Sequence, residues 1–267
     1  MKKRVIIDNL LKGIIILSSV VTVGFLAWIL LYVIMNGFSG IKLDFLQEIV
    51  PYIISTVYMI LVTIVISTPI GIGAAIYLVE YAKPGKVVKA IRFATESLAG
   101  IPSIVFGLFG FIFFVTTLNF GWSILSGALT LSIMVLPTIV RTTEEALKSV
   151  PNSYREGSLG LGASKLRTIR KVILPSAIPG ILTSVILSIG RIVGETAAIY
   201  LTAGTAKWIP DSVMDGGRTL AVHLYYLASE DVNFEKAFAT GTVLIIIILA
   251  INLTANALGS RLNKRKA

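Results

Sequence analysis

The sequence contains no cysteine and only one histidine among its 267 residues. Without cysteine there can be no disulfide framework and no thiolate metal site. The single histidine, His223, has no partners at ligand spacing, so we expect a packed or interfacial side chain and no metal site. The chain also lacks the G-x-x-x-x-G-K-[ST] pattern of a nucleotide-binding loop and any recognisable catalytic set. We therefore predict a non-enzymatic chain with no catalytic residue, no metal and no cofactor of its own.

Charged residues are also scarce, at 14% of the chain, whereas hydrophobic residues make up 55% and the mean hydropathy is +0.86. Apolar runs recur that are long enough to cross about 30 Å of hydrocarbon. No stretch is polar enough and long enough to form a separate soluble domain. The sequence predicts an all-α, polytopic membrane protein of one domain, residues 1–267, with six transmembrane helices. The six predicted spans are residues 13–35, 52–79, 98–118, 122–140, 176–203 and 237–258.

The basic residues are distributed unevenly between the two sides of these spans. Nineteen of the 24 Lys and Arg residues lie in the terminal segments and the even-numbered loops, and four lie in the odd-numbered loops. The positive-inside rule then places both termini and the loop 141–175 in the cytoplasm. The net charge of +10 is explained by topology and contact with anionic lipid, without nucleic acid. The first apolar run is too long for a signal peptide, so we expect it to remain as the first helix.

The loop 141–175 contains a patterned segment, Glu156–Pro175, with the sequence EGSLGLGASKLRTIRKVILP. Small residues at Gly157 and Ser158 allow a helix to approach a partner closely, and Gly162 can adopt the positive φ that ends it. The next residues predict a basic amphipathic helix over Ser164–Leu174. Such a hairpin can dock into a groove of a soluble protein, although the same residues could lie on anionic lipid.

This segment resembles the cytoplasmic EAA loop of the permease subunits of binding-protein-dependent ABC importers. At three positions this sequence has a different small or aliphatic residue: Gly157 and Ser158 replace the two alanines of the motif, and Val172 replaces its isoleucine. The matching residues are Glu156, Gly157, Ser158, Gly162, Val172, Leu174 and Pro175. The resemblance implies the type I ABC importer permease fold, with this loop docking to a cytoplasmic ATPase.

Two charged residues, Arg191 and Glu195, lie inside the otherwise apolar fifth span. They are four residues apart, so we predict that they lie on one face of this helix. An ionised side chain at mid-bilayer is costly, so the pair should face protein or a wet cavity and mark a translocation pathway. The alternative is a structural ion pair. The guanidinium suits an oxyanion, with Ser188, Thr196 and Thr202 as nearby hydroxyls, and the carboxylate could accept the proton that phosphate retains near neutral pH.

The motif R-x-x-G-E-T at Arg191–Thr196, the segment G-I-P-S at Gly100–Ser103 and the later TLAVHLYYLAS resemble the A-type permease of phosphate ABC importers. The resemblance implies a bacterial cytoplasmic membrane protein that moves phosphate by alternating access. It also implies four kinds of contact: a second, homologous permease, two copies of an ATPase that binds the ATP, an external phosphate-binding protein and membrane lipid. The external loop 204–236, which is acidic and aromatic, suits docking of that binding protein.

Two alternatives remain open from the sequence. A permease for another oxyanion, such as molybdate or sulfate, would share the same features. A self-sufficient secondary transporter or channel would use Arg191 and Glu195 as an ion or proton relay, and an internal inverted repeat would favour it. We find no such repeat in the sequence.

Overall fold

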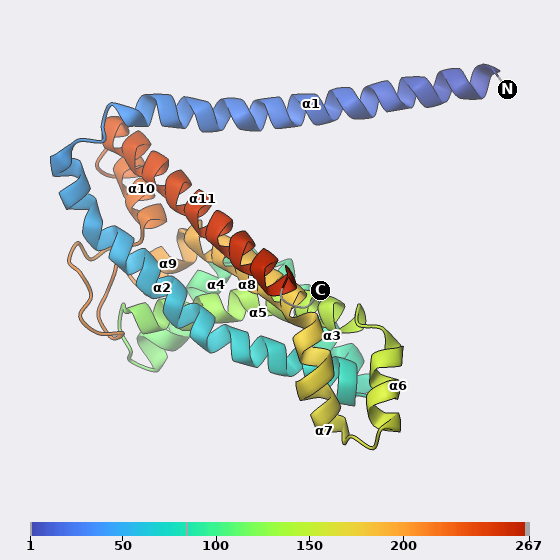
Figure 1. The fold of residues 1–267 in the computed structure, drawn as a ribbon. Coiled ribbons are helices and arrows are strands. Elements are labelled where there is room, and N and C mark those ends of the chain that lie inside the picture. Colours follow the sequence, from blue (N-terminus) through green and yellow to red (C-terminus); the bar gives the residue numbers. More distant parts are fainter. Residues whose placement is uncertain (1, 84, 265–267) are drawn as a thin grey trace.

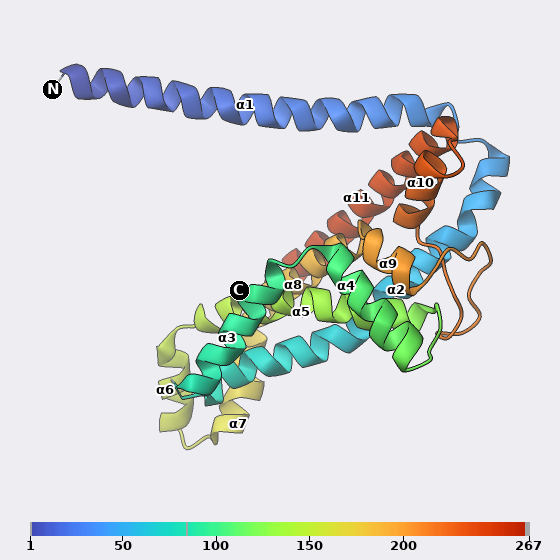
Figure 2. The same ribbon diagram turned by 180° about the vertical axis from the view of Figure 1, so that it is seen from behind.

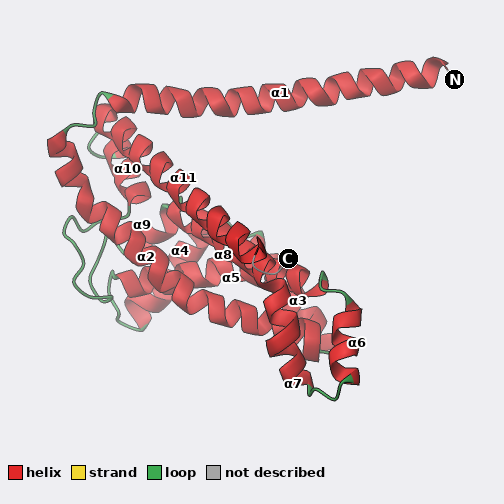
Figure 3. Cartoon of the chain, viewed as in Figure 1, coloured by secondary structure: helices red, strands yellow, loops and turns green. Residues whose placement is uncertain are grey.

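The computed structural model describes residues 2–83 and 85–264, and these residues form helices and loops without any strand (Figure 3). Five helical segments are long and apolar enough to cross a membrane. They are α1 (Lys2–Phe38), α2 (Leu43–Ile76) with the π-helical turn η1 (Tyr77–Tyr81), α5 (Ile124–Lys148), α7 (Lys165–Thr168) continuing through η3 (Ile169–Ile173) into α8 (Leu174–Val193), and α11 (Phe234–Lys264).

The sixth span is a bent pair of helices. It consists of α3 (Lys86–Ala99), followed after a bend of 104° by α4 (Ser103–Gly110) and η2 (Phe111–Thr117). The remaining helices are short: α6 (Asn152–Gly160), α9 (Ala197–Thr202) and α10 (Leu220–Ser229). The prediction of an all-α protein with six spans is confirmed.

Three predicted spans differ from the observed helices in their bounds. The span 98–118 is not one helix from residue 98: its second helix begins at Ser103, because Pro102 is extended and the chain turns sharply after α3. The span 122–140 begins at Ile124 and continues to Lys148, so residues 141–148 belong to a helix and not to the loop. The span 176–203 forms one helix with the preceding amphipathic segment and is interrupted after Val193.

Helix α5 is the centre of the packed body. Two thirds of its apolar stretch is buried, and α2 and α8 pack against it. The close approach of α2 depends on small residues: a Cβ on Gly71 would lie 2.6 Å from a side-chain carbon of Ile139. Leu131 and Met134 of α5 are fully buried in the same core as Met59 of α2. Within a lipid bilayer the hydrophobic effect contributes little to helix association. Dispersion between closely packed side chains therefore holds such helices together.

Helix α1 leaves this body as a long arm (Figures 1 and 2). It contacts α11 only near its own C-terminal end, where Gly37 lies against the backbone of Phe238 and the hydroxyl of Thr242 donates to the carbonyl of Val33 at 3.2 Å. Its apolar side chains are exposed over most of its length. This surface therefore needs a covering of lipid or of another protein.

The two ends of the body differ. Helices α6 and α7 project together at one end beside α3, and the loop 203–219 and α10 lie toward the opposite end (Figure 1). The hairpin side chains and the Arg191 region therefore belong to different parts of the molecule, linked by α5 and α8.

Candidate functional site

The fifth predicted span is interrupted where its two charged residues lie. Helix α8 ends at Val193, Gly194 follows as its C-cap, and α9 begins at Ala197. A spacing of four residues places side chains on one face only within a continuous helix. The prediction that Arg191 and Glu195 share a helix face is therefore wrong, because the helix does not continue between them.

Each of the two charged residues has surroundings of its own. Glu195 is buried, and its Oε1 accepts a hydrogen bond of 3.2 Å from the N–H of Ala198. The carboxylate thus satisfies one of the free N–H groups at the start of α9. Arg191 is half-buried in the last turn of α8 and makes neither an ion pair nor a hydrogen bond within the described part of the chain. The interruption leaves a cation without a protein partner.

The three hydroxyl residues predicted beside this pair have different roles. Ser188 and Thr202 are fully buried, and each donates to a carbonyl one turn earlier in its own helix, Ser184 at 2.8 Å and Ala198 at 2.6 Å. The hydrogen atoms of these two hydroxyls are therefore already engaged in hydrogen bonds to the backbone. Thr196 is half-buried within the interruption itself, next to Glu195 in the chain.

Helix α4 holds the short helix α9 in place. A Cβ on Gly107 would lie 2.8 Å from the Cα of Ala198, so this glycine is needed for the backbones to approach. The N–H of Ser123, at the start of α5, donates to the carbonyl of Thr202 at 3.1 Å. The short helix after the interruption is thus held by α4 on one side and by Ser123, the N-cap residue of α5, on the other.

The segment predicted to dock a partner forms a helical hairpin. Helix α6 ends at Gly160, Gly162 has a φ of +81°, and the next helix starts at Lys165. The predicted positive φ at Gly162 is confirmed. The predicted helix over Ser164–Leu174 does not end at Leu174 but runs on through Pro175 into α8.

The hairpin exposes polar and apolar groups together. Glu156 and Gly157 are exposed, and the hydroxyls of Ser158 and Thr168 lie 2.9 Å apart and join the two limbs. Leu161 at the tip is 91% exposed, so the turn of the hairpin presents a large apolar side chain. The other exposed apolar side chains of the hairpin are Tyr154, Leu159 and Leu166.

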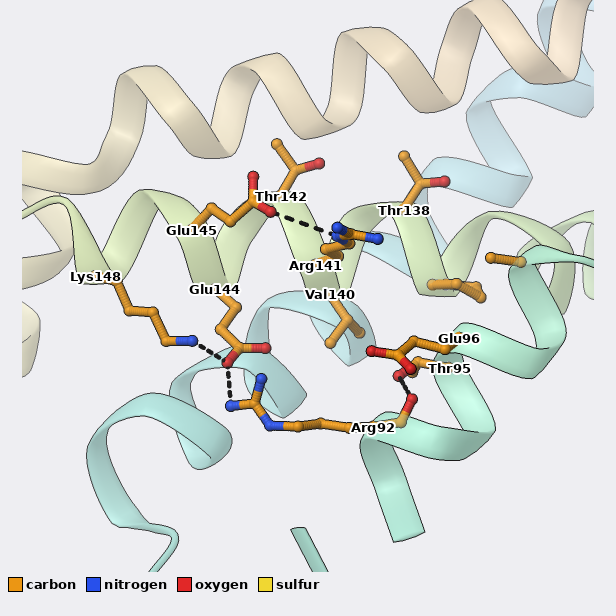
Figure 4. Close-up of a pocket in the computed structure, with 12 residues that line it drawn as sticks. Arg92, Thr95, Glu96, Thr138, Val140, Arg141, Thr142, Glu144, Glu145 and Lys148 are labelled. Carbon is orange, nitrogen blue, oxygen red and sulfur yellow. Dashed lines mark hydrogen bonds and ion pairs between the residues drawn. The ribbon is translucent and has the colours of Figure 1, made fainter. Parts of the chain in front are cut away.

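A cavity of about 390 Å³ lies between α3 and α5 near this end (Figure 4). Glu144 of α5 is almost fully buried beside it and pairs with Arg92 of α3 and with Lys148, whose Nζ lies 2.7 Å from its Oε1. Arg141 and Glu145 of α5, which also line this cavity, form an exposed pair. The buried carboxylate between two cations fixes the amphipathic helix α3 to the core.

At the opposite end of the molecule, aromatic rings surround Arg218, a buried cation in the loop 203–219. Arg218 is 2% exposed, donates twice to the carbonyl of Thr205 and lies 4.2 Å from the ring centroid of Tyr226. His223 stacks on Tyr52 at 3.9 Å, so the predicted packed histidine is confirmed. Burial, reinforced by the nearby charge of Arg218, lowers the pKa of His223 to about 3, so this histidine is neutral at physiological pH.

Comparison with known proteins places these features in a family. Residues 67–267 match the family described as binding-protein-dependent transport system inner membrane component. The chain belongs to this permease family. It is 35% identical to a probable ABC transporter permease, YqgI, of Bacillus subtilis, over 98% of each chain. It is also 36% identical to the phosphate transport system permease protein PstA of Pasteurella multocida, over 86% of each chain.

Solved structures agree on the fold. A permease chain of a bacterial alginate ABC transporter superposes with a TM-score of 0.74 at 15% identity, over 96% of each chain. The permease therefore has the type I ABC importer fold. The matched residues exclude α1 and the first part of α2, so they contain the hairpin and the interruption at Gly194 but not the exposed arm.

Several well-defined interactions in the permease were not found by reasoning from the sequence. The ion pairs Arg92–Glu144 and Glu80–Arg155 join residues 52 and 75 positions apart, and no local pattern indicates them. The pair Glu144–Lys148 does have a signal, since an acidic residue four positions before a basic one favours a pair on one helix face. Arg155 immediately precedes the Glu of the motif and could have been noted there.

Proposed function

We propose that this permease is a membrane subunit of an ATP-driven importer that moves inorganic phosphate by alternating access. The observation that carries the proposal is the unpartnered guanidinium of Arg191 at a helix interruption in a membrane-spanning segment. Broken helices of this kind, where irregular backbone lines a cavity, are typical of substrate sites in transporters. The relatives named as phosphate transport system permeases support phosphate as the anion.

The chemistry of the interruption suits a protonated oxyanion. Arg191 offers planar donors that match two phosphate oxygens. Glu195 uses one carboxylate oxygen for Ala198, and the other can accept the proton that phosphate carries near neutral pH. Fully ionised sulfate has no such proton and would be repelled. Thr196 adds a hydroxyl within the interruption. The hydroxyls of Ser188 and Thr202 bond to carbonyls of their own helices and are not available to the anion.

The exposed surfaces support the proposed assembly. The apolar arm α1 suits membrane lipid and a second, homologous permease, since neither α11 nor the body covers it. The hairpin around Gly162, with its exposed Leu161, suits one copy of a cytoplasmic ATPase, and a second copy would serve the other permease. The chain then needs no cofactor, because ATP binds to those partners. The loop 203–219 suits an external phosphate-binding protein.

Reconstitution tests the proposed function. The permease, its permease partner, the ATPase and the binding protein are placed in proteoliposomes, and uptake of radiolabelled phosphate, sulfate and molybdate is measured with and without ATP. We expect ATP-dependent uptake of phosphate, with little uptake of the other two anions. Preferred uptake of sulfate or molybdate would replace phosphate by another oxyanion. Uptake by the permease alone, without ATP, would instead indicate a secondary transporter or channel.

The proposed location is the bacterial cytoplasmic membrane with both termini inside. We expect a cysteine introduced at Asp215 to react with an impermeant thiol reagent added outside intact cells, and one at Lys165 to react only after permeabilisation. The distribution of Lys and Arg is the physical reason. The natural chain has no cysteine and supplies a matched blank for the labelling. Labelling at position 165 but not at 215 would reverse the orientation.

A further inference from the structure

Arg155 lies in α6, the first helix of the hairpin, and its guanidinium makes several hydrogen bonds to other parts of this chain. Its Nε and Nη2 donate to Oε1 of Glu80 at 3.1 and 2.9 Å. Its Nη2 also donates to the carbonyl of Leu147, and its Nη1 to the carbonyl of Val150, both at 2.8 Å. One side chain of α6 therefore joins the end of α2, through Glu80, to the end of α5.

Because these contacts are buried, their loss should be costly to the structure. The side chains of Arg155 and Glu80 are only 18% and 9% exposed, so water can replace little of what either would lose. Leu147 lies in the last turn of α5, where helix carbonyls lack partners within the helix, and Val150 follows directly after the C-cap Ser149. Removing the guanidinium would leave a buried carboxylate and these two carbonyls unpaired. An exposed ion pair would have no comparable effect.

The second limb of the hairpin is attached to the same place. Lys165 lies over the ring of Tyr81, 4.9 Å from its centroid, and Tyr81 belongs to the same π-helical turn as Glu80. Ser158 and Thr168 join the two limbs. A small apolar cluster fills the space beneath, made of Ala75, Ala146, Leu147, Val150, Ile173 and Ala177. The hairpin is thus fixed to the ends of α2 and α5 as one unit.

Helix α5 extends this connection to the interruption in the fifth span. Its N-terminal end lies against α9, where the N–H of the N-cap residue Ser123 donates to the carbonyl of Thr202. Ile199 of α9 is fully buried in the core that contains Leu131 and Met134 of α5. A displacement applied at Arg155 can therefore reach the residues around Glu195 through one continuous, largely buried helix.

We propose that Arg155 is a positioning residue that makes α6 and the ends of α2 and α5 move as one body, so that movement of the hairpin is transmitted to the pathway. This inference rests on the proposed function. Without Arg155, the hairpin still carries its docking surface, but its movement is no longer imposed on α2 and α5. ATP hydrolysis and transport then become uncoupled.

The test compares Arg155→Lys with the wild type in assembled, reconstituted complexes. Lysine keeps the charge but lacks the planar fork that lets Arg155 reach Glu80 and the carbonyls of Leu147 and Val150 together. We expect the ATPase to co-purify normally and ATP turnover to continue, while phosphate taken up per ATP hydrolysed falls about tenfold. The matched control is Glu145→Gln, which removes an exposed pair on α5 and should leave that ratio unchanged. An unchanged ratio in Arg155→Lys would overturn the proposal.

A cross-linking measurement decides the matter even if Arg155→Lys assembles poorly. Glu80→Cys and Arg155→Cys are combined in the cysteine-free chain, and a short bifunctional thiol reagent joins them. If the two positions move together, the cross-link should restore the uptake per ATP that the untreated double variant lacks. A cross-link that blocks uptake would show that they must separate, and the proposal would fail. Absence of phosphate uptake by the wild type would count against the proposed substrate, not against the role of Arg155.

Discussion

Replacing Arg191 by alanine is expected to lower phosphate uptake about 100-fold in a complex that assembles normally. A charge-assisted contact to an anion in a desolvated site contributes about 2 to 3 kcal/mol, and no other cation lies in the interruption to replace it. Since Arg191 has no protein partner among the described residues, its removal leaves no opposite charge unpaired and should cost little stability. Uptake is measured in proteoliposomes with matched amounts of complex.

Controls separate the anion role from a structural one. Leu187→Ala changes an exposed apolar residue one turn earlier in α8 and should leave uptake close to wild type. Glu195→Gln keeps an oxygen that can accept the hydrogen bond from the N–H of Ala198, so this variant should assemble normally. If it loses selectivity for phosphate over sulfate, the negative charge of Glu195 is what sets that selectivity. The double change Arg191→Ala/Glu195→Ala should transport no better than Arg191→Ala. Full uptake by this double variant would contradict the pathway role.

Replacing Gly162 by valine is expected to weaken association with the ATPase about tenfold or more while the protein still inserts in the membrane. The φ of +81° at this residue is costly for a β-branched side chain, with a strain of about 1 to 3 kcal/mol. The chain can relieve that strain only by reshaping the turn, which would move Leu161 and the two limbs apart. Co-purification of the ATPase with membrane-extracted permease measures the effect.

Two substitutions nearby make this test specific. Gly160→Ala adds a methyl group in open space at a residue without positive φ, so it should not change association. Gly162→Asn should be milder than Gly162→Val, because asparagine tolerates the left-handed region better. Normal ATPase yield and normal uptake in Gly162→Val would indicate that the hairpin does not dock and lies on lipid instead.

The sequence predicted the features that depend on local composition or short spacing. Lipid as a solvent demands long apolar helices, so the number and approximate positions of the spans could be read from hydropathy. The turn at Gly162 was predicted for a similar reason, because few residues other than glycine adopt that conformation. The packed state of His223 followed from its isolation in the sequence.

The helix interruption at Gly194 could not be predicted in this way. The apolar run continues on both sides of Arg191 and Glu195, and a glycine inside an apolar run is ordinary in membrane helices. What ends the helix there is tertiary: α4 approaches α9 through Gly107, and Ser123 of α5 binds the backbone of α9. The assumption of one continuous helix therefore gave a wrong relation between Arg191 and Glu195.

By itself, then, the sequence determined six apolar spans, the side of the membrane each loop is expected to face, and a glycine-hinged hairpin, since these depend on residues close together in the chain. Only the tertiary structure decided that Glu195 caps α9, that Arg191 is left without a partner, and that Arg155 joins α2 to α5. The first two depend on where the helix breaks, and the third depends on Glu80 and Arg155, which are far apart in the sequence and come together only when packing has fixed the helices.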